Sequence, residues 1–167
     1  MEEANNELQF SIGEHVVYPL QGVGVVTDIR SRTVHNREIL NYVIYLDISD
    51  MTVTVPVDKV ADIGIRGIVS GPEAAAAIES IKEKCEPSTL DWKQRYQANV
   101  ELVQQGSIGN VAKVVQALYH RSKVKELPVQ ERKLYESAMR LLIDEAAFAL
   151  DLTTSEVKKM VDENLGC

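Results

Sequence analysis

The hydrophobic pattern of this chain changes its period once, at residues 67–72, and this change restricts the fold to two differently built halves. Before it, short apolar and β-branched runs alternate with turn residues, as in small β-domains. After it, apolar residues recur every three or four positions, as in amphipathic helices. We therefore expect an α+β protein with two domains, at residues 9–69 and 70–167, and a disordered tail at residues 1–8.

The first half contains four runs with the length and composition of strands, at residues 16–18, 23–26, 42–46 and 51–56. Turn-forming residues separate the runs, at residues 19–22, in the polar stretch 31–38 and at Ser49–Asp50. Pro56 has no backbone N–H and is expected to close an edge strand. Four or five short strands in this space predict a small, strongly bent β-barrel of the SH3 or Tudor type.

The second half is expected to form a compact bundle of about five helices. Each expected start has its own signal, either a proline or a residue that caps a helix. These helices are expected after Gly71–Pro72, over about residues 90–105, from about Ser107, from Leu127–Pro128 and from Thr153, where the sequence TTSE has the form of a capping box.

Charge is distributed unevenly along the chain. The net charge is -7, yet residues 90–140 hold nine Lys or Arg and five Asp or Glu, which leaves the rest of the chain at -11. A basic segment inside an acidic protein permits a local DNA contact and argues against a general coat on nucleic acid. The polar N-terminus and the lack of a long apolar run predict a cytoplasmic protein without membrane contact.

The residues that usually carry catalysis or bind metals are scattered. His15, His35 and His120 fall in different expected elements, and the two cysteines, Cys85 and Cys167, form no CxxC pair. We therefore expect no metal site, no disulfide and no cofactor, and we expect Cys167 to be an exposed thiol. No Walker lysine, nucleophile elbow or HExxH motif is present, so the sequence predicts a protein that is not an enzyme.

Residues 90–99 read LDWKQRYQAN and contain the one tryptophan of the chain. In one interpretation, the indole of Trp92 wedges against an unstacked base step while Lys93 and Arg95 contact phosphates. In the other, Trp92 is an anchor of the helical core, the usual role of a single tryptophan.

A second candidate is an arginine cluster in the expected turn of the first half. Arg30, Arg32 and Arg37 are three of the five cations before residue 71. They form either a solvated hairpin tip or a contact with an acidic protein surface, which an exposed strand edge ending at Pro56 would assist.

Several of these segments resemble the CarD/CdnL family of bacterial transcription regulators. The likeness runs in order from about residue 10 to residue 165. It rests on IGEHVVYP at residues 12–19 followed by Gly22, MTVTVP at 51–56, IGIR at 63–66, LDWKQRY at 90–96 with Asn99, ERKLY at 131–135, and Leu141–Leu142.

The resemblance implies a Tudor-like domain that binds the β subunit of RNA polymerase, as the matching module of transcription-repair coupling factors does. It also implies a helical domain at the upstream edge of the transcription bubble, where a tryptophan at the Trp92 position wedges into the minor groove and steadies the open promoter complex. Arg32 falls at a polymerase-contacting arginine of the family. Thr54 stands where relatives carry Arg or Met, and Gln97 replaces a basic residue of some members, so both contacts are altered here.

We therefore predict a monomeric transcription regulator that is tethered to polymerase and by itself binds promoter DNA weakly, with salt sensitivity and without sequence preference. The alternative is an acidic adaptor whose helical domain binds a regulatory protein instead of DNA. The expected DNA contacts are Trp92, Lys93, Arg95, Tyr96, Asn99, Lys113 and Arg132. The expected polymerase contacts are Arg30, Arg32, Val53, Thr54 and Pro56.

Overall fold

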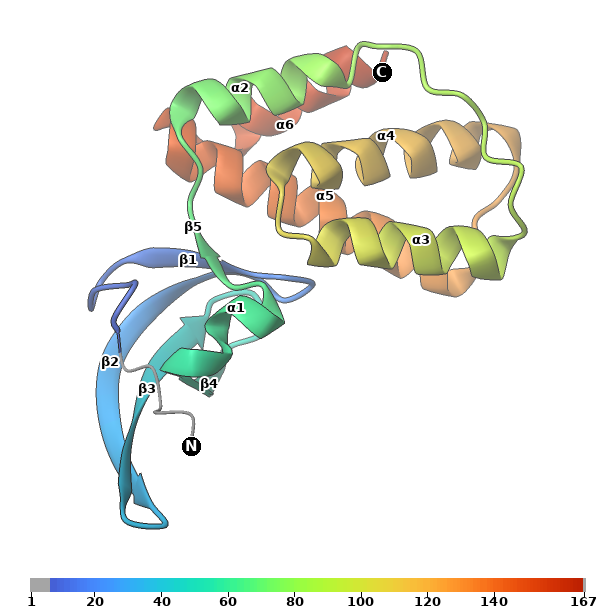
Figure 1. Cartoon of the computed structure of the whole chain (residues 1–167). Coiled ribbons are helices and arrows are strands. Elements are labelled where there is room, and N and C mark those ends of the chain that lie inside the picture. Colours follow the sequence, from blue (N-terminus) through green and yellow to red (C-terminus); the bar gives the residue numbers. More distant parts are fainter. Residues whose placement is uncertain (1–6, 167) are drawn as a thin grey trace. The chain divides into compact units, whose positions relative to one another are not determined.

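The computed structural model describes residues 7–166 and divides the chain into two compact units, Met1–Ile68 and Val69–Cys167 (Figure 1). The first unit is built on an antiparallel sheet and the second is helical, which confirms the α+β architecture with two domains. The predicted disordered tail falls mostly on residues 1–6, and the predicted exposed thiol on Cys167. Residues 1–6 and Cys167 lie outside the described residues, whereas Glu7 and Leu8 of the predicted tail are described and exposed.

The sheet has five strands in the order β4-β3-β2-β1-β5, namely β1 His15–Tyr18, β2 Gly22–Val34, β3 Arg37–Leu46, β4 Met51–Pro56 and β5 Arg66–Gly67. β4 is an edge strand that ends at Pro56, as predicted. Because β4 and β5 lie at opposite edges, the sheet that stands where a small, bent barrel was expected is not closed. A bulge between Val26 and Asp28 bends β2. At Gly24 a β-carbon would lie 2.8 Å from the carbonyl oxygen of Tyr45, so the close approach of β2 and β3 requires glycine.

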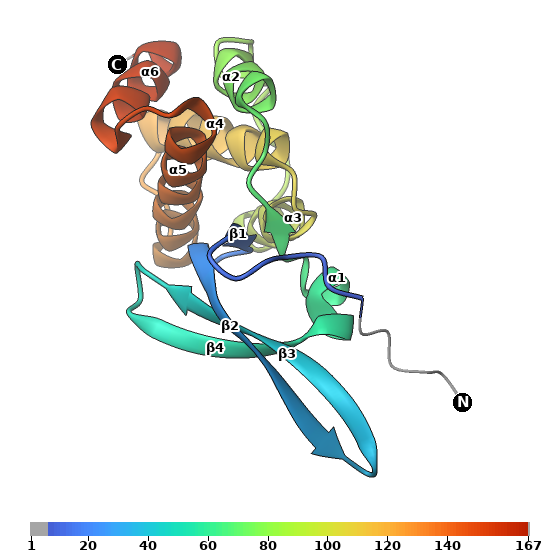
Figure 2. The same ribbon diagram turned by 90° about the vertical axis from the view of Figure 1, so that its left-hand side faces the viewer.

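β2 and β3 continue beyond the rest of the sheet as a two-stranded ribbon (Figure 2). β1 pairs with β2 only at residues 22–25 and β4 pairs with β3 only at residues 41–46, whereas the pairing of β2 with β3 continues to Val34 and Arg37. His35 and Asn36 have φ angles of 49° and 61°, the pattern of a two-residue type I′ turn. The prediction that residues 31–38 form a connecting turn is therefore wrong, because only two of them turn.

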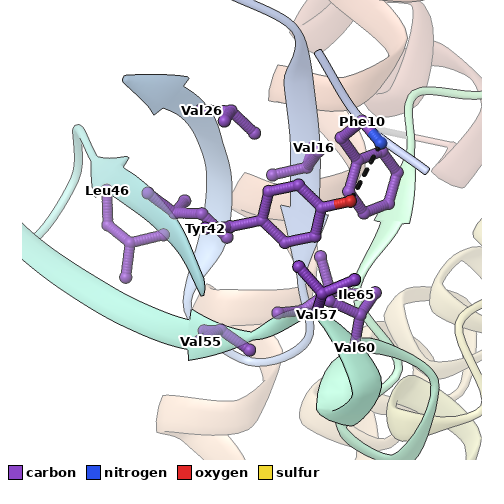
Figure 3. Packing of buried hydrophobic residues seen from close by; sticks show 10 residues of the cluster. Phe10, Val16, Val26, Tyr42, Leu46, Val55, Val57, Val60 and Ile65 are labelled. Carbon is purple, nitrogen blue, oxygen red and sulfur yellow. Dashed lines mark hydrogen bonds between the residues drawn. The ribbon is translucent and has the colours of Figure 1, made fainter. Parts of the chain in front are cut away.

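Tyr42 of β3 lies in the middle of the hydrophobic core of the first unit (Figure 3). Its ring is fully buried, with the ring of Phe10 at a centroid distance of 5.5 Å. Its hydroxyl oxygen accepts the backbone N–H groups of Gln9 (2.7 Å) and Phe10 (3.2 Å), which ties the start of the described chain to the sheet. The other members of the core are Val16, Val26, Ile44, Leu46, Val55, Val57, Val60 and Ile65.

A short helical segment that the sequence did not predict follows β4. A 3-10 turn at Val57–Lys59 leads into α1, Val60–Ile63, which ends at Gly64 with a φ of 88°. Four residues are too few to produce a helical hydrophobic period, so the pattern of the sequence could not show this helix.

Within the described residues, the second unit contains five helices: α2 Gly71–Ser80, α3 Trp92–Gln104, α4 Ile108–Val124, α5 Val129–Leu150 and α6 Thr154–Leu165. α6 begins with the predicted capping box, in which Thr153 Oγ1 accepts the N–H of Glu156 (3.1 Å) and Glu156 Oε2 accepts the N–H of Thr153 (2.9 Å). α4 and α5 form the most extensive helix–helix contact of the unit. Glu145 of α5 is fully buried and its Oε2 accepts the backbone N–H of Val69 (3.2 Å), which fixes the start of the unit to its interior.

Candidate functional site

The first turn of α3 presents the tryptophan at the surface. Asp91 Oδ1 accepts the backbone N–H of Gln94 (2.9 Å), and this cap starts the helix at Trp92. The Trp92 residue is 38% exposed, and Lys93 Nζ lies 5.8 Å from the centroid of its ring. A core anchor would be nearly buried, so this exposure argues against the interpretation of Trp92 as an anchor of the bundle.

Arg95 occupies a different position from the one expected of a phosphate contact. It is 7% exposed, and its guanidinium makes a two-pronged ion pair with Glu131, from Nε to Oε2 (2.8 Å) and from Nη2 to Oε1 (2.5 Å). Its Nη1 donates to the carbonyl oxygen of Leu90 (3.3 Å). Hydrogen bonding to Glu131 raises the pKa of Arg95 above its ordinary value. The expected DNA role of Arg95 is therefore corrected, because its charge is used to hold the first turn of α3 against the first turn of α5.

Asn99 is also corrected. It lies four residues after Arg95 on the same face of α3, is 7% exposed, and its Nδ2 has no hydrogen-bond partner among the described residues. Both side chains line a cavity of about 270 Å³ between residues 85–90, α3 and α4. Both residues are buried, so neither is exposed at the surface of the second unit.

The remaining DNA candidates fall into two places. Lys93 is exposed next to Trp92, and Tyr96 is half-buried one helical turn after it. Arg132 is exposed in the first turn of α5, the turn that the ion pair holds against α3. Lys113 is exposed in the second turn of α4. Because α3 and α4 form an antiparallel hairpin, this turn lies toward the C-terminal end of α3, away from Trp92 (Figure 1). The structure thus brings Trp92, Lys93 and Arg132 to one end of the bundle and places Lys113 apart from them.

In the first unit, four of the five expected polymerase contacts lie on one face of the sheet. Paired residues of neighbouring strands share a face, and the face alternates along each strand. Asn41 pairs with both Arg30 and Pro56, so these side chains form a row across β2, β3 and β4. Arg32 and Thr54 lie two residues from members of this row and therefore share its face.

Val53 is the exception. It lies on the opposite face of β4, is half-buried, and packs against the core cluster of the first unit. Its side chain is therefore removed from the expected contacts, and the four residues Arg30, Arg32, Thr54 and Pro56 are called the arginine face below.

The charge of Arg30 is partly engaged within this face. Its Nε lies 2.9 Å from Asp28 Oδ2, and both side chains are exposed to water. The hydrogen bond from Arg30 lowers the pKa of Asp28 below its ordinary value. An exposed pair of this kind exchanges readily with other partners, because it contributes little to stability.

Glu131, the buried partner of Arg95, is the residue of this candidate site that the sequence did not identify. It stands 36 residues after Arg95, and no short-range pattern connects an arginine and a glutamate at that separation. The structure shows no group of three or more His, Cys, Asp or Glu able to hold a metal ion within residues 7–166. None of the helices in this part of the chain is long and apolar enough to cross a membrane.

Comparison with known proteins gives one family match in each of the two compact units. Residues 10–69 match the family described as the CarD-like/TRCF RID domain, and residues 76–162 match the family described as CarD, C-terminal domain. The putative transcription factor YdeB of Bacillus subtilis (strain 168) is 30% identical over 149 residues, covering 89% of this chain and 97% of YdeB.

A further match is the solution structure of the 72-residue N-terminal domain of Myxococcus xanthus CarD. It is 34% identical to this chain, with a TM-score of 0.31, and the match covers 40% of this chain and 89% of that domain. The two family matches follow one another along the chain, and the likeness to YdeB extends over nearly all of that protein. This chain therefore belongs to the CarD family of transcription-associated regulators.

Proposed function

We propose that this protein is a non-enzymatic regulator that stabilises the open promoter complex. Its first unit would bind the β subunit of RNA polymerase through the arginine face. Its second unit would contact promoter DNA at the upstream edge of the bubble through the first turn of α3. The observation that carries the proposal is the exposed Trp92, set beside Lys93 on a helix end that a buried ion pair holds in place.

The chemistry of this helix end suits a DNA wedge. An indole inserted at a base step gains stacking, and neighbouring cations neutralise phosphates on either side. Lys93 and Arg132 supply two such cations near Trp92. The Arg95–Glu131 pair removes one charge of each sign from the surface, so the excess of positive charge over residues 90–140 is unchanged by its burial.

The contacts of each unit are expected to be weak when measured alone. Few cations surround Trp92, and the protein as a whole carries a charge of -7, so free DNA would be bound poorly and with strong salt dependence. Binding to polymerase raises the effective concentration of the second unit at the bubble edge. Preference of the indole for opened DNA then shifts the population toward the open complex.

Replacing Trp92 by alanine is expected to shorten the lifetime of the open complex about tenfold. The reason is the loss of one stacking contact, which is typically worth about 1–3 kcal/mol. The measurement is the decay of polymerase–promoter complexes after challenge with competitor DNA, with the wild-type protein and the variant in parallel.

Phe148→Ala is the matched control, since it also removes an exposed aromatic ring from a helix of the second unit. It is expected to leave the lifetime unchanged. If Trp92→Ala keeps the fold, keeps polymerase binding and still gives a wild-type lifetime, the DNA proposal fails and the adaptor hypothesis is favoured.

Replacing Arg32 by glutamate is expected to weaken binding to RNA polymerase by about tenfold or more, because like charges placed across an interface cost several kcal/mol. The measurement is co-purification and titration of the polymerase with the full-length protein. Lys59→Glu makes the same charge reversal at an exposed residue of the first unit outside the arginine face, and it should bind like wild type. Equal binding of all three proteins would contradict the assignment of this face.

A further inference from the structure

The second unit contains a cavity of about 270 Å³ that neither proposed interface uses. It lies between residues 85–90, α3 and α4. Much of its wall is formed by carbon-rich residues, namely Pro87, Leu90, Ala98, Ala117 and Val124. The volume is slightly below the range of pockets for drug-sized ligands, so it suits a molecule of one ring with a small substituent.

One wall of the cavity is a segment attached mainly at its two ends. Before it, Gln116 Nε2 donates to the carbonyl oxygen of Glu83, and after it, Arg95 Nη1 donates to that of Leu90. The described hydrogen bonds of residues 85–89 reach no further than two residues along the sequence. This wall is therefore able to move outward without breaking a hydrogen bond to α3 or α4.

Asn99 is the polar group that the cavity wall leaves unsatisfied. Arg95, one turn earlier on α3, already donates to Glu131 and Leu90. Asn99 is only 7% exposed, and its Nδ2 lacks a hydrogen-bond partner in the described part of the chain. An unpaired buried donor destabilises the folded state, and an acceptor brought by a ligand would remove that penalty.

We infer that this cavity binds a small aromatic carboxylate. The ring would fill the carbon-lined space, and the carboxylate would accept a hydrogen bond from Asn99 and be attracted by Arg121, which also lines the cavity. Arg95 is neutralised by Glu131, which leaves Arg121 and Glu86 as lining residues of opposite charge. Glu86 is exposed whereas Arg121 is half-buried, so the less exposed of the two charges is the one that attracts an anion. Burial raises the pKa of the Cys85 thiol, which also lines the cavity, and so disfavours its reactive thiolate form.

The test is a titration of the ¹⁵N-labelled full-length protein with sodium benzoate. Saturable shifts are expected in the backbone amide resonances of Ala98, Asn99 and Ala117, with a millimolar dissociation constant. Benzyl alcohol, which has the same ring without the charge, should bind about fivefold more weakly because charge-assisted hydrogen bonds are the stronger ones. Absence of saturable shifts, or shifts spread over the surface, would overturn the inference.

Two variants tie the shifts to the cavity. Ala117→Phe fills the space and should weaken benzoate binding more than about tenfold, whereas Ala76→Phe makes the same change at an exposed position of α2 and should not. Asn99→Leu keeps a similar volume and should abolish the preference for benzoate over benzyl alcohol. If Ala117→Phe fails to fold, the Asn99→Leu comparison decides the question, and an unchanged preference there would refute the role of Asn99.

Discussion

Replacing Glu131 by alanine is expected to destabilise the second unit by about 3–5 kcal/mol, since removal of one partner leaves a buried charge without compensation. The charge left behind is the guanidinium of Arg95, which would keep only its bond to Leu90. Urea denaturation followed by tryptophan fluorescence is the measurement. Trp92 is the one tryptophan of the chain and lies in this unit, so its emission reports the helical bundle alone.

Two further variants distinguish the stability lost with the ion pair from the effect of removing any carboxylate from α5. Glu136→Ala removes an exposed carboxylate from the same helix and is expected to change stability by less than about 0.5 kcal/mol. The double variant Arg95→Met, Glu131→Met replaces both charges by apolar groups and should recover most of the loss. If Glu131→Ala is no less stable than Glu136→Ala, the pair does not hold α3 in place.

Replacing Tyr42 by alanine is expected to destabilise the first unit by about 3–5 kcal/mol, because it leaves a large cavity among fully buried residues. Tyr42→Phe should cost about 1–3 kcal/mol, because the N–H groups of Gln9 and Phe10 lose their acceptor. Hydrogen–deuterium exchange is the measurement, with increased exchange expected first at residues 9–10 in Tyr42→Phe.

The control is Tyr45→Phe, which removes an exposed hydroxyl that donates to Asp50 Oδ1 (2.7 Å). It should change stability by less than about 0.5 kcal/mol. Since each unit is compact by itself, Tyr42→Ala should lose polymerase binding while the fluorescence transition of Trp92 stays at its wild-type denaturant concentration. A joint loss of both units in a single transition would contradict their independence.

The two-part architecture could be predicted because hydrophobic period is a property of local sequence. Strand runs such as residues 42–46 and the capping box at Thr153 are read directly from neighbouring residues. The ribbon could not be predicted in this way, because Thr33 and Glu38 are paired across a turn of only two residues inside a polar stretch. In that stretch, strand pairing outweighed the turn propensity of the individual residues.

Part of the candidate DNA site could be predicted, because residue types are visible in the sequence whereas partners distant along the chain are not. Trp92 and Lys93 were identified by residue type, and the structure exposes both. Arg95 has the same residue type as a phosphate contact, but its partner Glu131 lies far away in the sequence. A signal was present in the spacing, because Arg95, Asn99 and Val103 recur every fourth residue and so share one face of α3, and the apolar Val103 marks that face as the buried one.

The ribbon formed by the ends of β2 and β3 determines which substitution of Arg32 is suitable for a binding experiment. Two paired strands without further neighbours offer their outer edges to other chains, and charged side chains oppose such edge-to-edge growth between identical copies. Arg32, Arg37 and Glu38 occupy this part of the molecule. A neutral residue in place of Arg32 would lower the electrostatic repulsion between copies of the protein. Aggregation of that variant would then reduce the measured binding to polymerase even if the interface itself were intact. Arg32→Glu keeps a charge at this position, and the glutamates of two copies repel one another, so this variant avoids the artefact.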